Sequence, residues 1–423
     1  MAAPHDITQN GAVPQQPLRH SELAGGTARA EWRAHWPVAV TASIGVATGF
    51  TMLQYNTSQF IQPWQDAFGW SRGEIAAAHN GMILVALLAP AGGMLLDRFG
   101  VRVPLLTAMI LTVIGYCAMT LNNGNLVLFY ASYLFVQMVG ILTTGLAFTR
   151  VIAERFHASC GLALALSRIG ISVVGLFLPS LLHLVIADHG WQAGFLLLAG
   201  LLMFIGFPVC WFGIRSGQSP AAPPRRATGG PRLPTRGLAL LCAGAAFGYA
   251  PITAVLSQLH PLLMEHSLSG EQAAMLIGLL AGSVIVGVVA TGLLLDRIWG
   301  PLVACIITIP PVIGIAMLAT DSTSFAVMAV AVAMIGIAQG AEIDLIAYLV
   351  RRYHPLSQYS RVYGVTILCT IVLGVGAQIG IAVVHDVFGN YRIALGACVV
   401  ALIVSAGALL LLGPYPQPSL EKN

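Results

Sequence analysis

Charge is scarce in this sequence: Asp, Glu, Lys and Arg make up only 9% of its 423 residues, against 57% hydrophobic residues. A soluble globular protein carries roughly 25% charged residues. A lipid bilayer accounts for the deficit, because a charge held in hydrocarbon costs several kcal/mol unless it is paired or hydrated. The composition therefore argues against an ordinary soluble domain and predicts a protein embedded in a membrane.

Paired cysteine motifs and the short motifs of common enzymes are also missing. The seven cysteines lie singly in apolar stretches, and none forms a CxxC pair, which favours free thiols over a disulfide or metal framework. HExxH, GxSxG and phosphate-binding loops are absent from the sequence. We therefore expect a protein that is not an enzyme, with no cofactor, metal site or nucleic-acid partner. A membrane-embedded sensor or enzyme stays as a remote alternative.

Apolar stretches of about 20 residues recur, each long enough to cross a hydrocarbon core of about 30 Å. The first six fall near 37–62, 74–96, 103–122, 125–148, 160–186 and 192–214. The second six fall near 237–263, 272–295, 301–320, 324–348, 362–386 and 392–413. We expect an all-α membrane protein with twelve transmembrane helices in two six-helix bundles related by pseudo-two-fold symmetry.

Polar segments flank and divide these spans. Residues 1–35 lack an apolar core, so they predict a disordered cytoplasmic tail rather than a signal peptide. Residues 215–236 are rich in Pro, Gly and Arg and predict a flexible cytoplasmic linker. The expected domains are thus an N-terminal bundle over 36–214, a C-terminal bundle over 237–413 and a cytoplasmic tail over 414–423.

The basic residues predict the orientation. With both termini in the cytoplasm, seventeen of the 20 Lys and Arg fall in inner segments, as the positive-inside rule requires. We expect a multi-pass protein of the bacterial inner membrane that works as a monomer, with the lipid bilayer as its surroundings.

The two halves share an internal repeat. One offset of 199 residues takes Gly45 and Gly49 to Gly244 and Gly248, and Ser58-Gln59 to Ser257-Gln258. The same offset takes Gly93, Leu95, Asp97 and Arg98 to Gly292, Leu294, Asp296 and Arg297. Duplication explains a constant offset, and two repeated bundles with a substrate site between them are typical of alternating-access carriers.

A loop motif follows the second span: Gly93-Met-Leu-Leu-Asp97-Arg98-Phe-Gly100-Val-Arg102. It resembles the Gly-x-Leu-x-Asp-Arg-x-Gly-x-Arg/Lys signature of the major facilitator superfamily, and the copy at Asp296-Arg297 has Trp299 where the family has glycine. Asp97 lies at a helix end, where its carboxylate can meet an opposing helix N-terminus or a basic partner. Gly100 permits a tight reversal. The alternative is a topological anchor that only obeys the positive-inside rule.

A finer resemblance concerns one branch of that superfamily. The stretch Phe156-His-Ala-Ser-Cys-Gly161-Leu-Ala-Leu-Ala165 and the pairs Arg352-Tyr353 and Tyr363-Gly364 are similar to the monocarboxylate and oxalate/formate antiporter-like bacterial branch. That branch usually has an arginine in its eighth helix, and 272–291 has none. The resemblance implies a small monocarboxylate as substrate, while the departure argues against it.

Few ionisable residues fall inside the spans, so each is a functional candidate. Arg168, Glu342 and Asp344 lie at similar depths on the same side of the membrane. We expect a charge pair between the halves, Arg168 with Glu342 or Asp344, that closes the cytoplasmic side. The two acids point about 200° apart on a helix, so Asp344 is expected at the gate and Glu342 at the coupling proton. Two alternatives stay open: both acids are hydrated at a helix end, or Arg168 binds a substrate carboxylate bidentately.

The rest of the expected cavity is uncharged. The resemblance implies that spans 1, 4, 7 and 10 surround it, which selects these polar and aromatic residues: Gln54, Tyr55, Asn56, Gln59, Tyr133, Gln137, Tyr249, Gln258, His260 and Gln339. Each could instead be a polar contact between helices. Polar groups among aromatic rings suit a small organic solute.

The predicted function is therefore secondary active transport of a small organic solute, most simply a carboxylic acid, by alternating access coupled to protons or to a counter-substrate. Proton-driven efflux of drug-like or amphipathic compounds is the alternative. The fifth span, Gly170-Ile-Ser-Val-Val-Gly175-Leu-Phe-Leu-Pro179, lacks the Gly-Pro-rich motif of the efflux branch.

Overall fold

The computed structural model of the chain describes residues 20–214 and 235–415, and within these ranges it is helical without strands. The helices of the first half are α1 (His20–Thr48), α2 (Thr51–Asn56), α3 (Ser58–Phe68), α4 (Arg72–Asn80), α5 (Met82–Phe99), α6 (Arg102–Thr120), α7 (Leu126–Gly140), η1 (Ile141–Thr143), α8 (Gly145–Arg155), α9 (Cys160–His189), α10 (Trp191–Leu201), η2 (Leu202–Gly206) and α11 (Phe207–Gly213). Those of the second half are α12 (Thr235–Ser257), α13 (Leu259–Glu265), α14 (Gly270–Leu295), α15 (Gly300–Leu318), α16 (Phe325–Tyr353), η3 (Leu356–Gln358), α17 (Tyr359–Phe388) and α18 (Arg392–Leu410).

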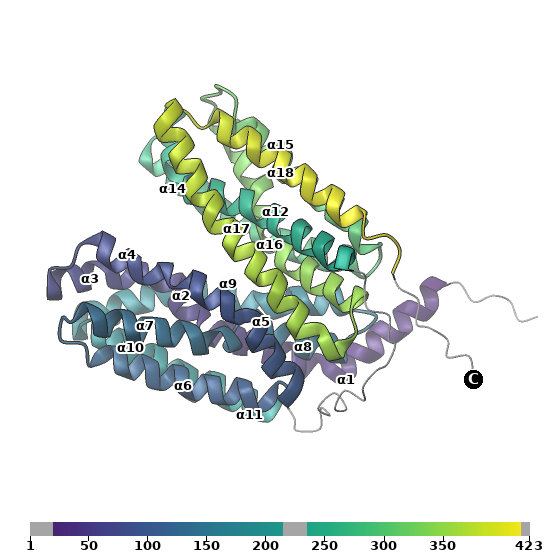
Figure 1. Ribbon diagram of the computed structural model, residues 1–423, viewed down its shortest axis with the longest axis horizontal. Helices are drawn as coiled ribbons and strands as arrows, with labels where there is room; N and C mark the ends of the chain where they lie inside the picture. Colours follow the sequence, from purple (N-terminus) through teal and green to yellow (C-terminus); the bar gives the residue numbers. More distant parts are fainter. Residues whose placement is uncertain (1–19, 215–234, 416–423) are drawn as a thin grey trace, which may run out of the picture.

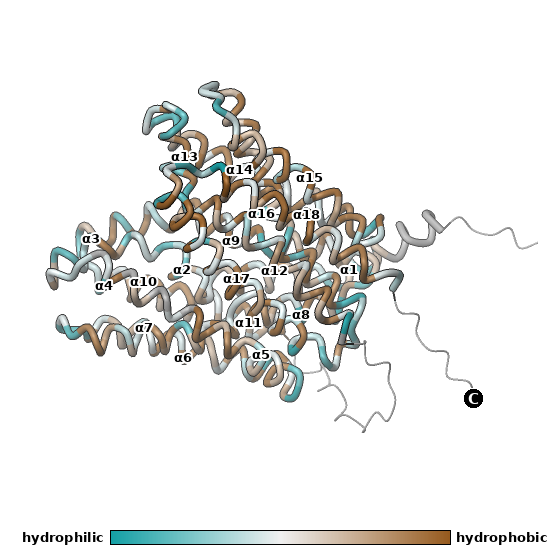
Figure 2. Tube along the Cα trace, turned by 45° about the horizontal axis from the view of Figure 1, so that its top comes forward, coloured by the Kyte–Doolittle hydropathy of each residue, from teal (hydrophilic) through white to brown (hydrophobic). Residues whose placement is uncertain are grey.

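Ten helical segments of the described chain are long and apolar enough to cross a membrane. The interrupted segments α1–α3 and α4–α5 provide the other two crossings of a twelve-span architecture, which confirms the fold predicted from hydropathy. Figure 2 shows hydrophobic residues running along the helices and hydrophilic residues gathered at the turns. This distribution is what a hydrocarbon core requires, since backbone polar groups there must be satisfied within the protein.

Both halves interrupt their first crossing. The backbone N–H of Phe50, between α1 and α2, donates to Thr143 Oγ1 at 2.9 Å. A methyl group on Gly49 would lie 2.5 Å from the Thr143 carbonyl oxygen, so the close approach requires glycine. A second interruption at Thr57 in the first half has a near-counterpart at Gln258 in the second. The internal repeat is therefore visible in the positions of the helix interruptions as well as in the sequence.

The two bundles form a V (Figure 1). The lower bundle contains α1–α11 and the upper one α12–α18, and they diverge towards the ends that carry α3, α4 and the labelled end of α14. They meet near the end where α11 finishes and α12 begins, and there α5 packs against α17 and α9 against α14. We call this the linker-side end.

The N-terminal segment differs from its prediction. Residues 20–35, expected as part of a disordered tail over 1–35, belong to α1. The helix continues because Trp32 packs on Phe156 with ring centroids 4.9 Å apart and Glu31 bonds the turn that follows α8. Residues 1–19, 215–234 and 416–423 lie outside the described residues, so the remaining tail and linker predictions stay predictions.

Candidate functional site

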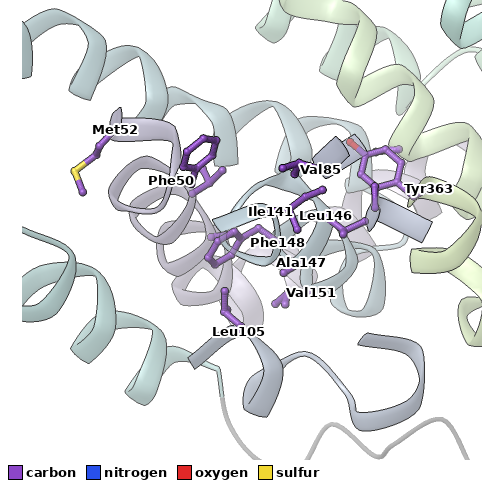
Figure 3. Packing of buried hydrophobic residues seen from close by; sticks show 14 of the residues in the cluster. Phe50, Met52, Val85, Leu105, Ile141, Leu146, Ala147, Phe148, Val151 and Tyr363 are labelled. Carbon is purple, nitrogen blue, oxygen red and sulfur yellow. The ribbon is translucent and has the colours of Figure 1, made fainter. Parts of the chain in front are cut away.

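A cavity of about 210 Å³ lies between the two bundles. The first bundle contributes Gln54, Tyr55, Gln137 and Arg168 to its lining, and the second contributes Tyr249, Glu342 and Tyr363. Aliphatic side chains complete the wall, and Figure 3 shows Val85, Ile141 and Leu146 of the first bundle near Tyr363 of α17. The site thus combines a mainly apolar wall with a few polar and charged groups, as small-molecule sites do.

Arg168 of α9 faces Asp344 of α16 across the interface between the bundles. The Arg168 Nε to Asp344 Oδ1 distance is 3.8 Å, and the side chains are 20% and 1% exposed. This is an ion pair but is too long for a hydrogen bond, and neither carboxylate oxygen of Asp344 has a hydrogen-bond partner among the described residues. The guanidinium, which lines the same cavity as Tyr55, Tyr249 and Tyr363, therefore keeps donors available to a ligand.

Glu342 lies two residues earlier on α16 and points elsewhere. Its side chain lines the central cavity, while Oε1 is turned towards Gly248 of α12 and has no hydrogen-bond partner in the described chain. A second cavity of about 20 Å³, enough for one water molecule, reaches Glu342 from within the second bundle. The helix α16 continues to Tyr353, and both acids are buried. The alternative in which Glu342 and Asp344 are hydrated at a helix end is therefore wrong. The repeat adds a contrast, since Thr143, the counterpart of Glu342, faces Gly49 as Glu342 faces Gly248.

The loop motif lies at the linker-side end. Asp97 of α5 accepts hydrogen bonds from the backbone N–H groups of Ser360 at 3.2 Å and Arg361 at 3.0 Å, in the first turn of α17. It also forms an ion pair with Arg150, which is 2% exposed and donates to Ser360 Oγ at 3.0 Å. A carboxylate at a helix N-terminus is favourable, so Asp97 joins the two bundles.

The repeated motif makes the reciprocal contact. Asp296 accepts from the N–H groups of Gly161 at 2.6 Å and Leu162 at 3.0 Å in the first turn of α9. The offset of 199 residues that relates Asp97 to Asp296 also relates Gly161 and Leu162 to Ser360 and Arg361. Burial raises the pKa of Asp296 to about 6, although the hydrogen bonds from the two N–H groups lower it. Both motif copies thus bind the opposite bundle through one pseudo-symmetric geometry.

The remaining motif residues have local roles. Gly93 packs so closely on α17 that an added methyl group would lie 2.1 Å from the Ser360 carbonyl oxygen. Gly100 has a φ of +74°, a left-handed conformation that favours glycine. Arg102 donates to the Trp211 carbonyl oxygen at 3.2 Å, while Arg98 and Arg297 are exposed.

Six of the ten uncharged residues expected to line the cavity lie outside its wall: Asn56, Gln59, Tyr133, Gln258, His260 and Gln339. Asn56 Nδ2 donates to the Met52 carbonyl oxygen at 2.8 Å, and Tyr133 bonds Thr57 Oγ1 at 3.1 Å. Gln258 accepts from the Tyr391 hydroxyl at 3.2 Å, and His260 is exposed. Asn56, Gln59, Gln258 and His260 lie at or beyond the interruptions of the first crossing in each half, whereas Tyr133 and Gln339 lie on the uninterrupted helices α7 and α16.

Two residues at these sites were not selected from the sequence: Arg150 and Glu31 complete the linker-side contacts. Tyr363, noticed only as part of the resemblance to one branch of the superfamily, completes the cavity wall. Arg150 could have been noticed as an arginine at the end of an apolar span. Glu31 could not, because its neighbours are polar and mixed.

Two duplicated helical bundles that enclose a central cavity define a secondary transporter built from repeats. The chain belongs to the Major Facilitator Superfamily, whose family model matches residues 44–370. Comparison with curated protein sequences finds no significant match. The family match confirms the superfamily prediction, while the monocarboxylate and oxalate/formate branch stays a prediction.

Solved structures show the same fold. FucP, described as the E. coli fucose:proton symporter, matches in its outward conformation with a TM-score of 0.71 and 14% identity, over 89% of this chain and 99% of that one. The human organic anion transporter TETRAN matches with a TM-score of 0.66 and 16% identity, over 90% and 99%. The proton:xylose symporter XylE matches with a TM-score of 0.68 and 13% identity, over 90% and 96%. At these identities the likeness concerns the fold alone.

Proposed function

We propose that the protein takes up a small organic acid across the bacterial inner membrane by alternating access, coupled to protons. The observation that carries this proposal is Arg168 in the wall of the cavity between the bundles, with its guanidinium held loosely by Asp344. A guanidinium presents donors in a fork that matches a carboxylate. An anionic substrate is therefore the ligand for which this wall is best suited.

The cavity volume favours a small solute. Sites for drug-sized ligands have volumes of about 300–1,000 Å³, and the cavity here has about 210 Å³. Its many aliphatic residues, among them Ile171, Ile343 and Ile367, suit an acid with an apolar body. The same apolar wall supports the second candidate, proton-driven efflux of amphipathic compounds, for which a larger cavity would be expected.

The charges suggest how coupling works. An entering carboxylate competes with Asp344 for Arg168, so the charge pair between the bundles breaks when the substrate binds. Glu342 has no ion-pair partner within the described residues, and an isolated buried carboxylate is costly. We assign the coupling proton to Glu342 and the gating charge pair to Arg168 and Asp344.

The orientation follows from the basic residues. Placing the linker and both termini in the cytoplasm satisfies the positive-inside rule and puts the linker-side contacts of Asp97 and Asp296 on the cytoplasmic face. In this orientation the described conformation is closed to the cytoplasm and faces outward.

Two experiments test the proposal together. A thermal-shift screen of organic acids on the purified protein should find ligands that raise its apparent stability, since binding to the folded state does so. Proteoliposomes should then accumulate the best ligand when an inward proton gradient is imposed. Accumulation that does not depend on the proton gradient would rule out proton coupling. Binding of neutral or cationic amphipathic compounds alone would favour the efflux alternative.

A further inference from the structure

The first turn of α9 is held by two carboxylates from different parts of the chain. Asp296, from the opposite bundle, binds the N–H groups of Gly161 and Leu162. Glu31, from the N-terminal part of α1, accepts from the N–H groups of His157 at 3.2 Å, Ala158 at 3.0 Å and Ser159 at 3.2 Å. Only the Asp296 contact has to break when the cytoplasmic end opens.

Ser159 is the N-cap residue of α9, yet it does not cap this helix. An N-cap serine ordinarily has an extended backbone, and its hydroxyl oxygen accepts from the N–H of the second or third helical residue. In α9 those residues are Gly161 and Leu162, which Asp296 binds instead. The Ser159 hydroxyl donates to Glu31 Oε2 at 3.1 Å, and its ψ of 33° is not extended.

The same chain contains two internal comparisons. Ser269, the N-cap of α14, bonds to no acidic side chain within the described ranges. It has an extended ψ of 156°, and its hydroxyl oxygen accepts from Gln272 N at 3.2 Å. The repeat counterpart of Ser159 is Gln358, the N-cap of α17, whose side chain does not cap that helix either. Of the two helices whose first turns bind an aspartate of the opposite bundle, α9 and α17, only α9 therefore has a short hydroxyl side chain at its N-cap that could compete with that aspartate. Glu31 binds this hydroxyl.

We propose that Glu31 is a positioning residue of the cytoplasmic gate, which keeps Ser159 from capping α9 so that the capping group is Asp296 of the opposite bundle. By binding three successive N–H groups and the Ser159 hydroxyl, Glu31 holds the turn in a conformation that leaves Gly161 and Leu162 available. Without Glu31, Ser159 takes its ordinary N-cap conformation and competes with Asp296. The contact between α9 and α14 then weakens, and the outward-facing conformation loses population.

Cys160 is a native reporter of this contact. It is 3% exposed and begins the turn whose next residue, Gly161, packs on Gly292 and donates to Asp296 of the opposite bundle. Opening of the cytoplasmic end removes these neighbours and exposes the thiol. Cys210 is fully buried within the first bundle and reports unfolding instead.

The experiment measures the rate at which N-ethylmaleimide alkylates Cys160 of the full-length purified protein at pH 7.5, read by mass spectrometry of the peptides. Glu31→Ala should raise the rate about fivefold, the factor to which the typical strength of a serine N-cap, about 1 kcal/mol, converts. Glu31→Ala with Ser159→Ala should return it to within about twofold of the wild type, because the competing cap is gone. Ser159→Ala alone and the matched control Glu271→Ala, in the exposed first turn of α14 at the far end, should leave it unchanged.

Three results would overturn the proposal: no change for Glu31→Ala, a double variant as reactive as Glu31→Ala, or a parallel rise at Cys210. The inference rests on the alternating access of the proposed function but not on the substrate. Alkylation needs no ligand, so a failed screen of organic acids and a failed rescue by Ser159→Ala are separate outcomes.

Discussion

At the scale of single residues, the charges between the bundles decide the chemistry. Arg168 and Asp344 form the ion pair across the interface, while Glu342 faces Gly248 inside the second bundle. The spacing of two residues predicts that the two acids diverge, and the structure pairs Asp344 with Arg168 and turns Glu342 towards Gly248. Which acid meets the arginine depends on the rotation of α16, which no local pattern specifies.

Arg168→Ala should abolish uptake and also destabilise the protein, because it leaves Asp344 buried without a partner. Breaking a buried pair from one side costs about 3–5 kcal/mol. Arg168→Ala with Asp344→Asn should recover most of the melting temperature but none of the uptake. Thermal unfolding in detergent and uptake into proteoliposomes measure the two effects, and normal uptake by either variant would remove Arg168 from the mechanism.

Glu342→Gln should separate transport from the proton gradient. The amide is similar in size but carries no exchangeable charge, so the variant should still exchange labelled for unlabelled substrate while losing accumulation against a gradient. Counterflow and gradient-driven uptake in the same proteoliposomes distinguish the two activities, with Glu271→Gln as the control. A variant that still concentrates substrate would place the proton site elsewhere.

At the scale of helices, glycines determine how closely the bundles approach. Gly93 of α5 meets Ser360 of α17, and Gly161 of α9 meets Gly292 of α14, where an added methyl group would lie 2.5 Å from the carbonyl oxygen. Small residues permit such approaches between membrane helices. The Asp97 and Asp296 contacts depend on them, because a hydrogen bond of about 3 Å to a backbone N–H needs the helices in place.

Gly93→Ala should prevent the linker-side end from closing. Its methyl group would lie 2.1 Å from a backbone oxygen of α17, which cannot move as a flexible side chain would. We expect faster alkylation of Cys160 and at least a tenfold loss of uptake, since about 1.4 kcal/mol against closure already gives a factor of ten. Gly278→Ala on α14, where an added methyl group meets nothing within 4 Å, should change neither; equal behaviour of the two variants would contradict the expectation.

At the scale of the whole molecule, duplication gives two bundles that bind each other through equivalent contacts at one end. The equivalence is incomplete: Arg150 strengthens the Asp97 contact but has Leu349 as its counterpart, and Glu31 acts only beside the Asp296 contact. Because the Asp97 and Asp296 contacts involve different side chains, they can differ in strength. A substitution can therefore weaken one of these contacts without changing the other.

The orientation of the whole molecule predicts a labelling pattern. In a variant without native cysteines, Ser219→Cys in the linker should react with a membrane-impermeant maleimide only after spheroplasts are lysed. Thr320→Cys, in the exposed turn after α15, should react in intact spheroplasts. The reverse labelling pattern would show that the protein has the opposite orientation in the membrane, and the described conformation would then face inward.

The sequence by itself determined the twelve crossings, the duplication and the superfamily, because hydropathy, a constant offset and the Asp97-Arg98 loop are properties of contiguous residues. It also selected Arg168, Glu342 and Asp344, since ionisable groups are rare in apolar spans. Only the tertiary structure decided that Asp344 rather than Glu342 meets Arg168, that Asn56 and Tyr133 turn away from the cavity, and that Glu31 bonds the start of α9. These depend on helix rotation, on interruptions at Gly49 and Thr57, and on contacts between residues more than a hundred positions apart, and none of these is encoded in a local pattern.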